Sequence, residues 1–227
     1  MSTDRIPPNR LAHLYSFFSS NPAPVQPAPV ANTLPRRFIL WVDGVGGFLA
    51  CLNDELTVGQ ADPGTGVDIP IVSDISRQHA RIIRRDGDYL VEPRGDVQLR
   101  GKTIRQPTLL MHNDEITLGN DTRLHFQRPH PLSSTARLNL LSPYRTDPRS
   151  DAILLVSQTL MLGNNSRSHV VCPEWDNEMV LFQQDQQLFC RSNQPLEVDG
   201  SPLVSQLPIH CGQRLRGENC AVSLEEV

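Results

Sequence analysis

The sequence predicts an all-β protein, built as two tandem β-sandwiches behind a proline-rich, flexible N-terminal tail. Two observations predict this fold. From residue 37 onward, short apolar runs alternate with turn residues about every ten positions, which is typical of sandwiches and barrels. The second half of the chain then repeats the order of the first half in outline. We therefore expect a tail at residues 1–36, a first sandwich at 37–129, a linker at 130–135 and a degenerate second sandwich at 136–227.

Composition narrows the class of protein. The chain has 227 residues, of which 38% are hydrophobic and 20% charged, so it is long enough for one or two cores. Its net charge of −4 argues against a general binder of nucleic acid or anionic membranes. No apolar stretch approaches the ~18 residues of a membrane span, and the first residues lack a signal-peptide pattern. Five scattered cysteines without a C-x-x-C motif favour a reducing compartment, so we expect a soluble cytoplasmic protein.

The tail has two parts. Residues 9–19 place Leu11, Leu14, Phe17 and Phe18 at helical spacing, which fits either a short amphipathic helix or a disordered segment. Residues 21–35 are rich in proline, which lacks an amide donor and fixes φ, so an extended linker is expected.

The first sandwich is predicted strand by strand. An apolar run at 38–42 turns through Asp43–Gly47 into a second run at 48–51. A hairpin turn explains this glycine-rich stretch better than a phosphate loop, because neither G-x-G-x-x-G nor G-K-[ST] is present. The further strands are expected at 55–58, 68–72, 79–84, 89–92, 97–99, 102–104, 108–110, 114–118 and 123–127.

The second sandwich is predicted from matching runs in the same order. Residues 138–141 parallel 38–41, residues 152–156 parallel 48–52, and residues 160–164 parallel 56–60. Later matches are 196–200 with 97–101 and 212–215 with the region around 113–116. The order is kept and the intervals are close, which indicates a degenerate copy.

Several pieces of the first repeat resemble a forkhead-associated (FHA) domain. They are Leu56-Thr57-Val58-Gly59-Gln60, Ser76-Arg77-Gln78-His79, Tyr89 to Pro93, Gly101 to Ile104 and Asn113 to Gly119. The Ser-Arg-x-His motif is informative because the segments before and after it also match the family, in the same order and at the same intervals. The resemblance implies a β-sandwich that recognises phosphothreonine in partner proteins through loops at one end.

The resemblance also implies roles for particular residues. Ser76 would bond the phosphate through its hydroxyl, Arg77 would add charge at the rim, and His79 would brace the loops. Gln60 stands where the family usually has arginine, so it can donate a hydrogen bond but brings no charge. The family's asparagine-glycine pair falls around Gly95-Asp96, where the asparagine is missing. Arg94 or Arg100 would then supply the compensating charge.

The second repeat is expected to be poorly equipped for phosphate. Residues 166–169 (Ser-Arg-Ser-His) match the Ser-Arg-x-His pattern of the first repeat. They follow Gly163 too closely, however, to form the loop equivalent to the one that carries Ser76. Aligned pocket positions fall near Glu174 and Asn177, which are poor phosphate ligands. A structural or protein-contact role is therefore expected.

Enzymes are the least favoured class. Neither G-x-S-x-G nor H-E-x-x-H occurs, and the histidines and cysteines lack zinc-ligand spacing. His210, Cys211 and Cys220 form the nearest approach to a thiol or metal site. We expect no cofactor, no metal and no catalytic residue.

The sequence thus predicts a phosphothreonine-dependent adaptor in Ser/Thr kinase signalling, with a phosphothreonine-bearing protein or its own N-terminal tail as partner. Thr3 with Ile6 has a spacing that FHA domains often favour, which suggests self-recognition. The alternative is a scaffolding module with an FHA fold that binds no phosphate.

Overall fold

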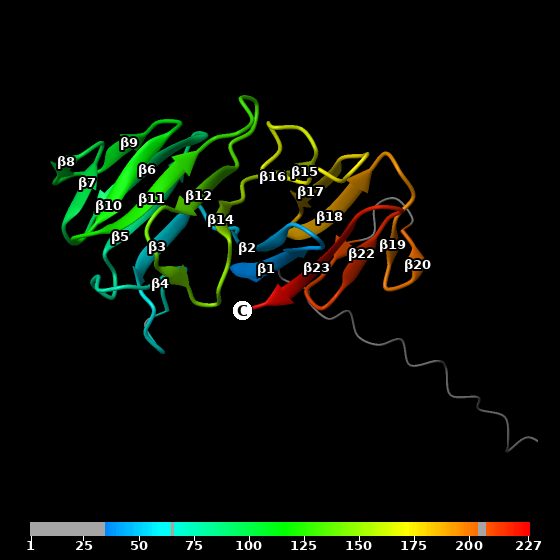
Figure 1. Ribbon diagram of the computed structural model, residues 1–227, viewed down its shortest axis with the longest axis horizontal. Coiled ribbons are helices and arrows are strands. Elements are labelled where there is room, and N and C mark those ends of the chain that lie inside the picture. The colour runs from blue at the N-terminus through cyan, green and yellow to red at the C-terminus, as the bar shows by residue number, and fades with distance from the viewer. Residues whose placement is uncertain (1–34, 65, 204–207) are drawn as a thin grey trace, which may run out of the picture. The chain divides into compact units, whose positions relative to one another are not determined.

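The computed structural model describes residues 35–64, 66–203 and 208–227, and all its regular elements there are β-strands (Figure 1). The predicted all-β fold class is confirmed. The predicted helix at 9–19 and proline-rich linker at 21–35 lie, except for Pro35, outside the described residues. No helix in the described ranges is long and apolar enough to cross a membrane.

The predicted strands of the first repeat are present. They are β1 (Arg37–Val42), β2 (Gly46–Cys51), β3 (Glu55–Gln60), β4 (Ile69–Val72), β5 (Ala80–Arg85), β6 (Asp88–Pro93), β7 (Val97–Leu99), β8 (Lys102–Ile104), β9 (Thr108–Leu110), β10 (Asp114–Leu118) and β11 (Thr122–Gln127). Alternating apolar and polar residues explain most of them, because successive side chains point to opposite faces of a sheet.

The remaining strands follow a similar order. They are β12 (Ala136–Leu140), β13 (Arg145–Thr146), β14 (Ala152–Leu155), β15 (Thr159–Gly163), β16 (Val170–Val171), β17 (Met179–Gln184), β18 (Gln187–Ser192), β19 (Glu197–Val198), β20 (Ser201–Pro202), β21 (Pro208–Ile209), β22 (Arg214–Arg216) and β23 (Ala221–Glu226). β13 has no counterpart between β1 and β2, where a short turn at residues 43–45 joins the strands.

Strand pairing crosses the expected sequence boundaries. β1 pairs with β23, near the far end of the chain, and β12 pairs with β11. Figure 1 shows the blue β1–β2 hairpin beside the red β23. The β1–β2 pair of the first repeat therefore lies beside strands of the second repeat and completes their sandwich. The β12–β14 pair of the second repeat lies beside strands of the first repeat and completes theirs. The division of the sequence into repeats at 37–129 and 136–227 stays a prediction, whereas this pairing is observed.

The parallel pairing of β2 with β14 joins these two groups of strands into one 12-stranded sheet. Its strand order is β20-β19-β22-β23-β1-β2-β14-β12-β11-β10-β7-β8. Two smaller sheets pack against it, β13-β4-β3-β5-β6-β9 and β16-β15-β17-β18-β21. We call the half with the six-stranded sheet the first sandwich and the half with the five-stranded sheet the second sandwich.

The two hydrophobic cores lie on opposite faces of the large sheet. On β2, Phe48 belongs to the core of the second sandwich, and its neighbour Leu49 belongs to the core of the first. β14 behaves in the same way, with Leu154 in the second core and Ile153 in the first. This follows from the two-residue period of a strand, which sends adjacent side chains to opposite faces. The central strands are consequently apolar on both faces.

Candidate functional site

The candidate site lies where four connections of the first sandwich meet. They are the β3–β4 loop (described at 61–64 and 66–68), the β4–β5 loop (73–79), the β6–β7 loop (94–96) and the β10–β11 turn (119–121). Loops on a rigid sandwich are a common place for binding residues, because the strands fix their ends. We call this set the loop end.

His79 connects three of these loops through its ring. The side chain is only 4% exposed. Its Nδ1 accepts a hydrogen bond from the Ser76 amide at 3.0 Å, and its Nε2 lies 2.9 Å from the Asp96 carbonyl, to which it donates when it carries the ring proton. The Gly119 amide donates to that same carbonyl at 2.8 Å and also lies 3.0 Å from Nε2. One buried ring thus holds the β4–β5, β6–β7 and β10–β11 connections together.

Two glycines allow the loops to approach so closely. A Cβ atom at Gly59 would lie 1.9 Å from the carbonyl oxygen of Arg77, and one at Gly95 would lie 2.7 Å from the His79 ring. Both distances are far below any real contact, so neither position tolerates a side chain without moving the backbone or the ring. Gly59 therefore admits the β4–β5 loop over β3, and Gly95 admits the bracing histidine.

Backbone hydrogen bonds bring most of the predicted residues together. The Gln60 amide donates to the Ser76 carbonyl at 3.0 Å, and the Arg94 amide donates to the His79 carbonyl at 2.9 Å. Ser76 is exposed, and no described residue hydrogen-bonds to its hydroxyl. The hydroxyl is therefore available to a ligand.

The charges at the loop end are already partly balanced. Arg77 is 76% exposed, but its Nε lies 3.1 Å from Oδ2 of Asp62 in the β3–β4 loop. The half-exposed Arg94 guanidinium lies 3.4 Å from the Glu92 carboxylate. Ion pairs this exposed contribute little stability, about 0–1 kcal/mol. A dianionic phosphate could therefore exchange with Asp62 at low cost.

Arg100 does not join the loop end. Its guanidinium forms a two-pronged pair with Asp114, at 2.6 Å and 2.7 Å, and its Nη2 also donates to the Leu109 carbonyl at 3.2 Å. Asp114 begins β10, whereas the loop end follows the last residue of that strand. Of the two arginines predicted as alternatives, Arg94 and Arg100, the fold therefore brings only Arg94 close to Ser76 and His79.

The look-alike motif of the second repeat occupies a different connection. Ser166 to His169 lie between β15 and β16, a parallel pair that corresponds to β3 and β4. His169 accepts a hydrogen bond from the Met161 amide, not from Ser166. The equivalent of the β4–β5 loop is residues 172–178, which contain Glu174 and Asn177 together with Asp176 and Glu178. These carboxylates would repel a phosphate.

The thiols near the C-terminus lack the character of nucleophiles. Burial raises the pKa of Cys211 to about 11 and also raises that of Cys220, so both thiols stay protonated at neutral pH. Among the described residues, no three His, Cys, Asp or Glu side chains are grouped as metal ligands.

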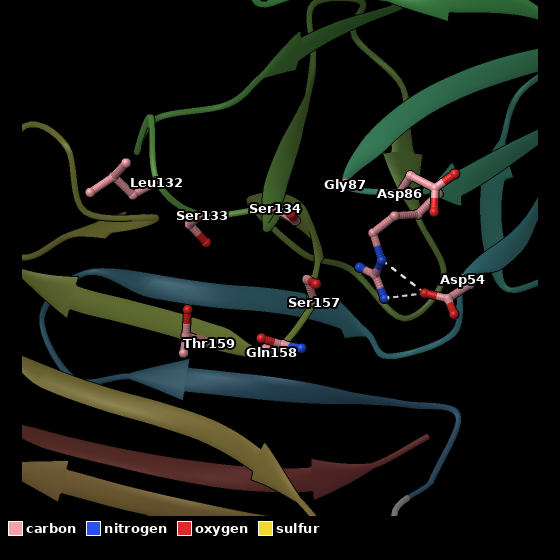
Figure 2. Close-up of a pocket in the computed structure, with 10 residues that line it drawn as sticks. Asp54, Asp86, Gly87, Leu132, Ser133, Ser134, Ser157, Gln158 and Thr159 are labelled. Atoms are coloured by element: carbon pink, nitrogen blue, oxygen red, sulfur yellow. Dashed lines mark hydrogen bonds and ion pairs between the residues drawn. The ribbon is translucent and has the colours of Figure 1, made fainter.

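A polar cavity lies at the other end of the first sandwich (Figure 2). It measures about 330 Å³ and is lined by Asp54 just before β3, the β5–β6 hairpin, residues 132–134 and residues 157–159. Asp54, labelled in Figure 2, forms an ion pair with Arg84, and 2.6 Å separates its Oδ1 from the arginine Nη2. The strongest cation of this cavity is therefore already neutralised, and the cavity is separate from the loop end.

Comparisons with known proteins point to one family. The FHA domain family model matches residues 56–119. The FHA domain of the CT664 protein from Chlamydia trachomatis is 32% identical over 37% of this chain and 89% of that chain, with a TM-score of 0.28. The FHA-2 domain of the ABC transporter Rv1747 from Mycobacterium tuberculosis is 18% identical over 58% of this chain and 98% of that chain, with a TM-score of 0.32. No curated protein matches the chain.

Loops held together at one end of a rigid β-sandwich form a surface suited to binding. The chain belongs to the FHA domain family, as the sequence predicted. FHA domains are phosphopeptide-binding protein-interaction modules.

One part of the loop end escaped the sequence prediction. Tyr144, from the connection between β12 and β14, donates a hydrogen bond to the Asp121 carboxylate at 2.8 Å. The pairing of β13 with β4 and this hydrogen bond place the segment beside the first sandwich. The sequence carries one signal for it, because the interval between the first two strands is longer in the second repeat than in the first.

Proposed function

We propose that the chain is a phosphothreonine-dependent protein-binding adaptor, and that its loop end binds the phosphorylated residue. The Ser76 hydroxyl donates to the phosphate, Arg77 leaves Asp62 to pair with it, and Gln60 and Arg94 border the ligand. The observation that carries this proposal is the bracing by His79, which holds the Ser76 amide, the Asp96 carbonyl and the β10–β11 turn in one arrangement. A preorganised site loses little free energy on ordering its loops when the ligand binds.

Affinity is expected to be modest. A hydrogen bond to a charged group contributes about 1.5–3 kcal/mol, and Gln60 replaces the arginine that would make one. At about 1.4 kcal/mol for each factor of ten, this replacement weakens binding roughly tenfold to a hundredfold. Exposed arginines such as Arg77 recover part of this loss, because guanidinium groups pair well with phosphate.

The partner in this proposal is a protein phosphorylated by a Ser/Thr kinase in the cytoplasm. The chain's own tail is a second candidate, through Thr3, which lies outside the described residues.

Titration of fluorescent peptides tests the proposal. We expect the wild type to bind a phosphothreonine peptide more tightly than its phosphoserine and unmodified forms. Ser76→Ala should weaken phosphothreonine binding about tenfold or more, because it removes a charge-assisted donor. Ser166→Ala is the matched control, since it removes an exposed serine from the look-alike motif, and it should leave binding unchanged.

The competing function is a scaffold that binds unmodified protein. Asp62 on Arg77 and the uncharged Gln60 favour it. Equal affinity for modified and unmodified peptides, unaffected by Ser76→Ala, would establish the scaffold and refute the phosphate site.

A further inference from the structure

The connection between β12 and β14 is unusually elaborate for a link between neighbouring strands. It spans residues 141–151, and it contains the two-residue strand β13. The corresponding β1–β2 link needs only residues 43–45. The longer link lies beside the first sandwich, because β13 pairs with β4 at the edge of the six-stranded sheet. We call residues 141–151 the connector.

The connector is fixed at several points near the loop end. Its β13 pairs antiparallel with β4, and the Asp147 amide donates to the Pro70 carbonyl at 3.1 Å. Tyr144 anchors it to the β10–β11 turn through Asp121. A segment held by both backbone and side-chain bonds presents its remaining side chains in a defined place.

The connector carries two exposed arginines, Arg145 and Arg149, of which Arg145 lies on β13. Arg145 lies opposite Val72, which is 40% exposed and ends β4 immediately before the β4–β5 loop that carries Ser76. Its neighbour Thr146 lies opposite the buried Ile71 and is itself buried. Side chains opposite one another share a face of the sheet, so Arg145 projects outward. None of the ion pairs found among the described residues involves Arg145.

The register relates Arg145 to the position where the family's arginine is missing. Gln60 on β3 lies opposite Ile71 on β4, and Ile71 lies opposite Thr146 on β13. Adjacent strands are about 4.8 Å apart, so β13 runs roughly 10 Å from β3. Arg145, one residue before Thr146, is thus two strands from Gln60 at nearly the same height along the sheet, on the outward face.

The charge of nearby carboxylates also bears on how the loop end could bind an anionic ligand. Tyr144 hydrogen-bonds to Asp121, and this bond, together with burial and the charges of Asp121 and Asp74, raises the pKa of the Tyr144 hydroxyl. Two carboxylates thus face this side of the loop end and would repel an anionic ligand. A cation beside them would offset that repulsion, and Arg145 follows Tyr144 directly in the chain.

We propose that Arg145 binds an anionic group of the phosphopeptide, so that the connector forms part of the binding surface. This inference rests on the proposed function of the loop end. The anionic group is the phosphate itself or an acidic side chain next to the phosphothreonine. Both sources offer the same chemistry, a singly or doubly charged oxyanion for a guanidinium.

The test measures binding of three peptides to the full chain: a phosphothreonine peptide with neutral flanks, the same peptide with aspartates on both sides, and the unphosphorylated acidic peptide. We expect Arg145→Ala to weaken phosphopeptide binding about two- to fivefold, as for an exposed ion pair. Arg145→Glu should weaken it further, and Arg145→Lys should retain most of it. The difference should shrink in high salt, because exposed charges are screened.

Arg85→Ala is the matched control, since Arg85 is also an exposed arginine but ends β5 at the opposite end of the sandwich. Thermal melts of every variant check that the fold is unchanged.

The outcomes separate the two claims. Weaker binding of both phosphopeptides assigns Arg145 to the phosphate, and weaker binding of the aspartate-flanked peptide alone assigns it to the neighbouring side chain. Arg145 variants that match Arg85→Ala, while Ser76→Ala still weakens binding, would overturn the role of the connector and leave the phosphate site intact. A wild type that binds no phosphopeptide more tightly than its unmodified form would overturn both.

Discussion

Two buried histidines of this chain have very different surroundings. Both ring nitrogens of His79 lie within hydrogen-bond distance of backbone groups, and the ring holds the loop end together. His169 is fully buried, with Nδ1 accepting from the Met161 amide and Nε2 without a hydrogen-bond partner among the described residues. Burial, with a smaller contribution from His130, lowers the pKa of His169 to about 4.

The lowered pKa of His169 predicts acid sensitivity. The unfolded chain takes up this proton near pH 6.5 and the folded chain only near pH 4. Neutral His169 therefore leaves the free energy of unfolding at its full value above about pH 6.5. This free energy falls as the pH drops toward 4, because protons bind more readily to the unfolded chain. The loss should be about 3 kcal/mol, at 1.36 kcal/mol per pH unit over that window.

Urea unfolding of the wild type and His169→Asn between pH 7 and 4 measures this effect. The variant should show a shallower fall in the free energy of unfolding. His125→Gln, which changes a less buried histidine on β11, should behave as the wild type does. Equal slopes for all three proteins would contradict the prediction.

At the scale of single elements, β9 shows how a sheet edge is closed. This strand ends the six-stranded sheet, and both Leu109 within it and Met111 just after it are exposed. Arg100 donates to the Leu109 carbonyl, and Asp114 accepts from the Met111 amide at 2.7 Å. Burial alone would raise the pKa of Asp114, but the bonds from Arg100 and Met111 more than offset this, so the pKa lies below its usual value. An ion pair thus occupies backbone groups that an open edge would offer to another chain.

Removing this edge closure should destabilise the protein. Asp114→Ala leaves the Met111 amide without its acceptor and Arg100 without its partner, and we expect it to lower the free energy of unfolding by about 1–3 kcal/mol. Glu115→Ala is the control, because the neighbouring Glu115–Arg123 pair is 3.6 Å long between exposed side chains and should contribute less than about 1 kcal/mol. Chemical denaturation compares the two. If both variants lowered the free energy of unfolding by the same small amount, the Arg100–Asp114 pair would not be needed to stabilise the sheet edge.

The edge also illustrates the limit of sequence reasoning. The strands were predictable because their apolar periodicity is local, and Ser76 and His79 could be picked out because their spacing is local too. Arg100 was predicted at the loop end from its proximity to Gly95 along the chain. Its partner Asp114 lies on another strand, and no local pattern reveals which side chains a tertiary fold will bring together.

For the whole molecule, the decisive feature is the sharing of strands between the two cores. Adjacent residues on β14 serve different cores: Ile153 is buried in the first sandwich and Leu154 in the second. The sequence could not predict this exchange, because the runs at 38–42 and 138–141 have the same apolar character. Either would fit beside β11 or β23, and strand order decides between them only in the folded state.

This sharing predicts a single unfolding transition. Ile153→Ala and Leu154→Ala should each cost about 2–5 kcal/mol through the cavities they leave, and each should lower the melting temperature of the whole described structure. Differential scanning calorimetry should show one peak for the wild type and for both variants. Ser201→Ala, an exposed change on β20, is the control and should leave the peak in place. Two peaks, with each variant moving only one of them, would show that the sandwiches unfold independently.

The pairing of β1 with β23 has a consequence for protein synthesis. β1 is synthesised long before its partner, because the strand beside it is complete only once residue 226 has been added. Throughout that interval, the hairpin of β1 and β2 exists without the neighbour that covers its edge, and unpaired apolar strands of this kind invite aggregation. Chaperone binding to the nascent chain should therefore persist until β23 has been synthesised.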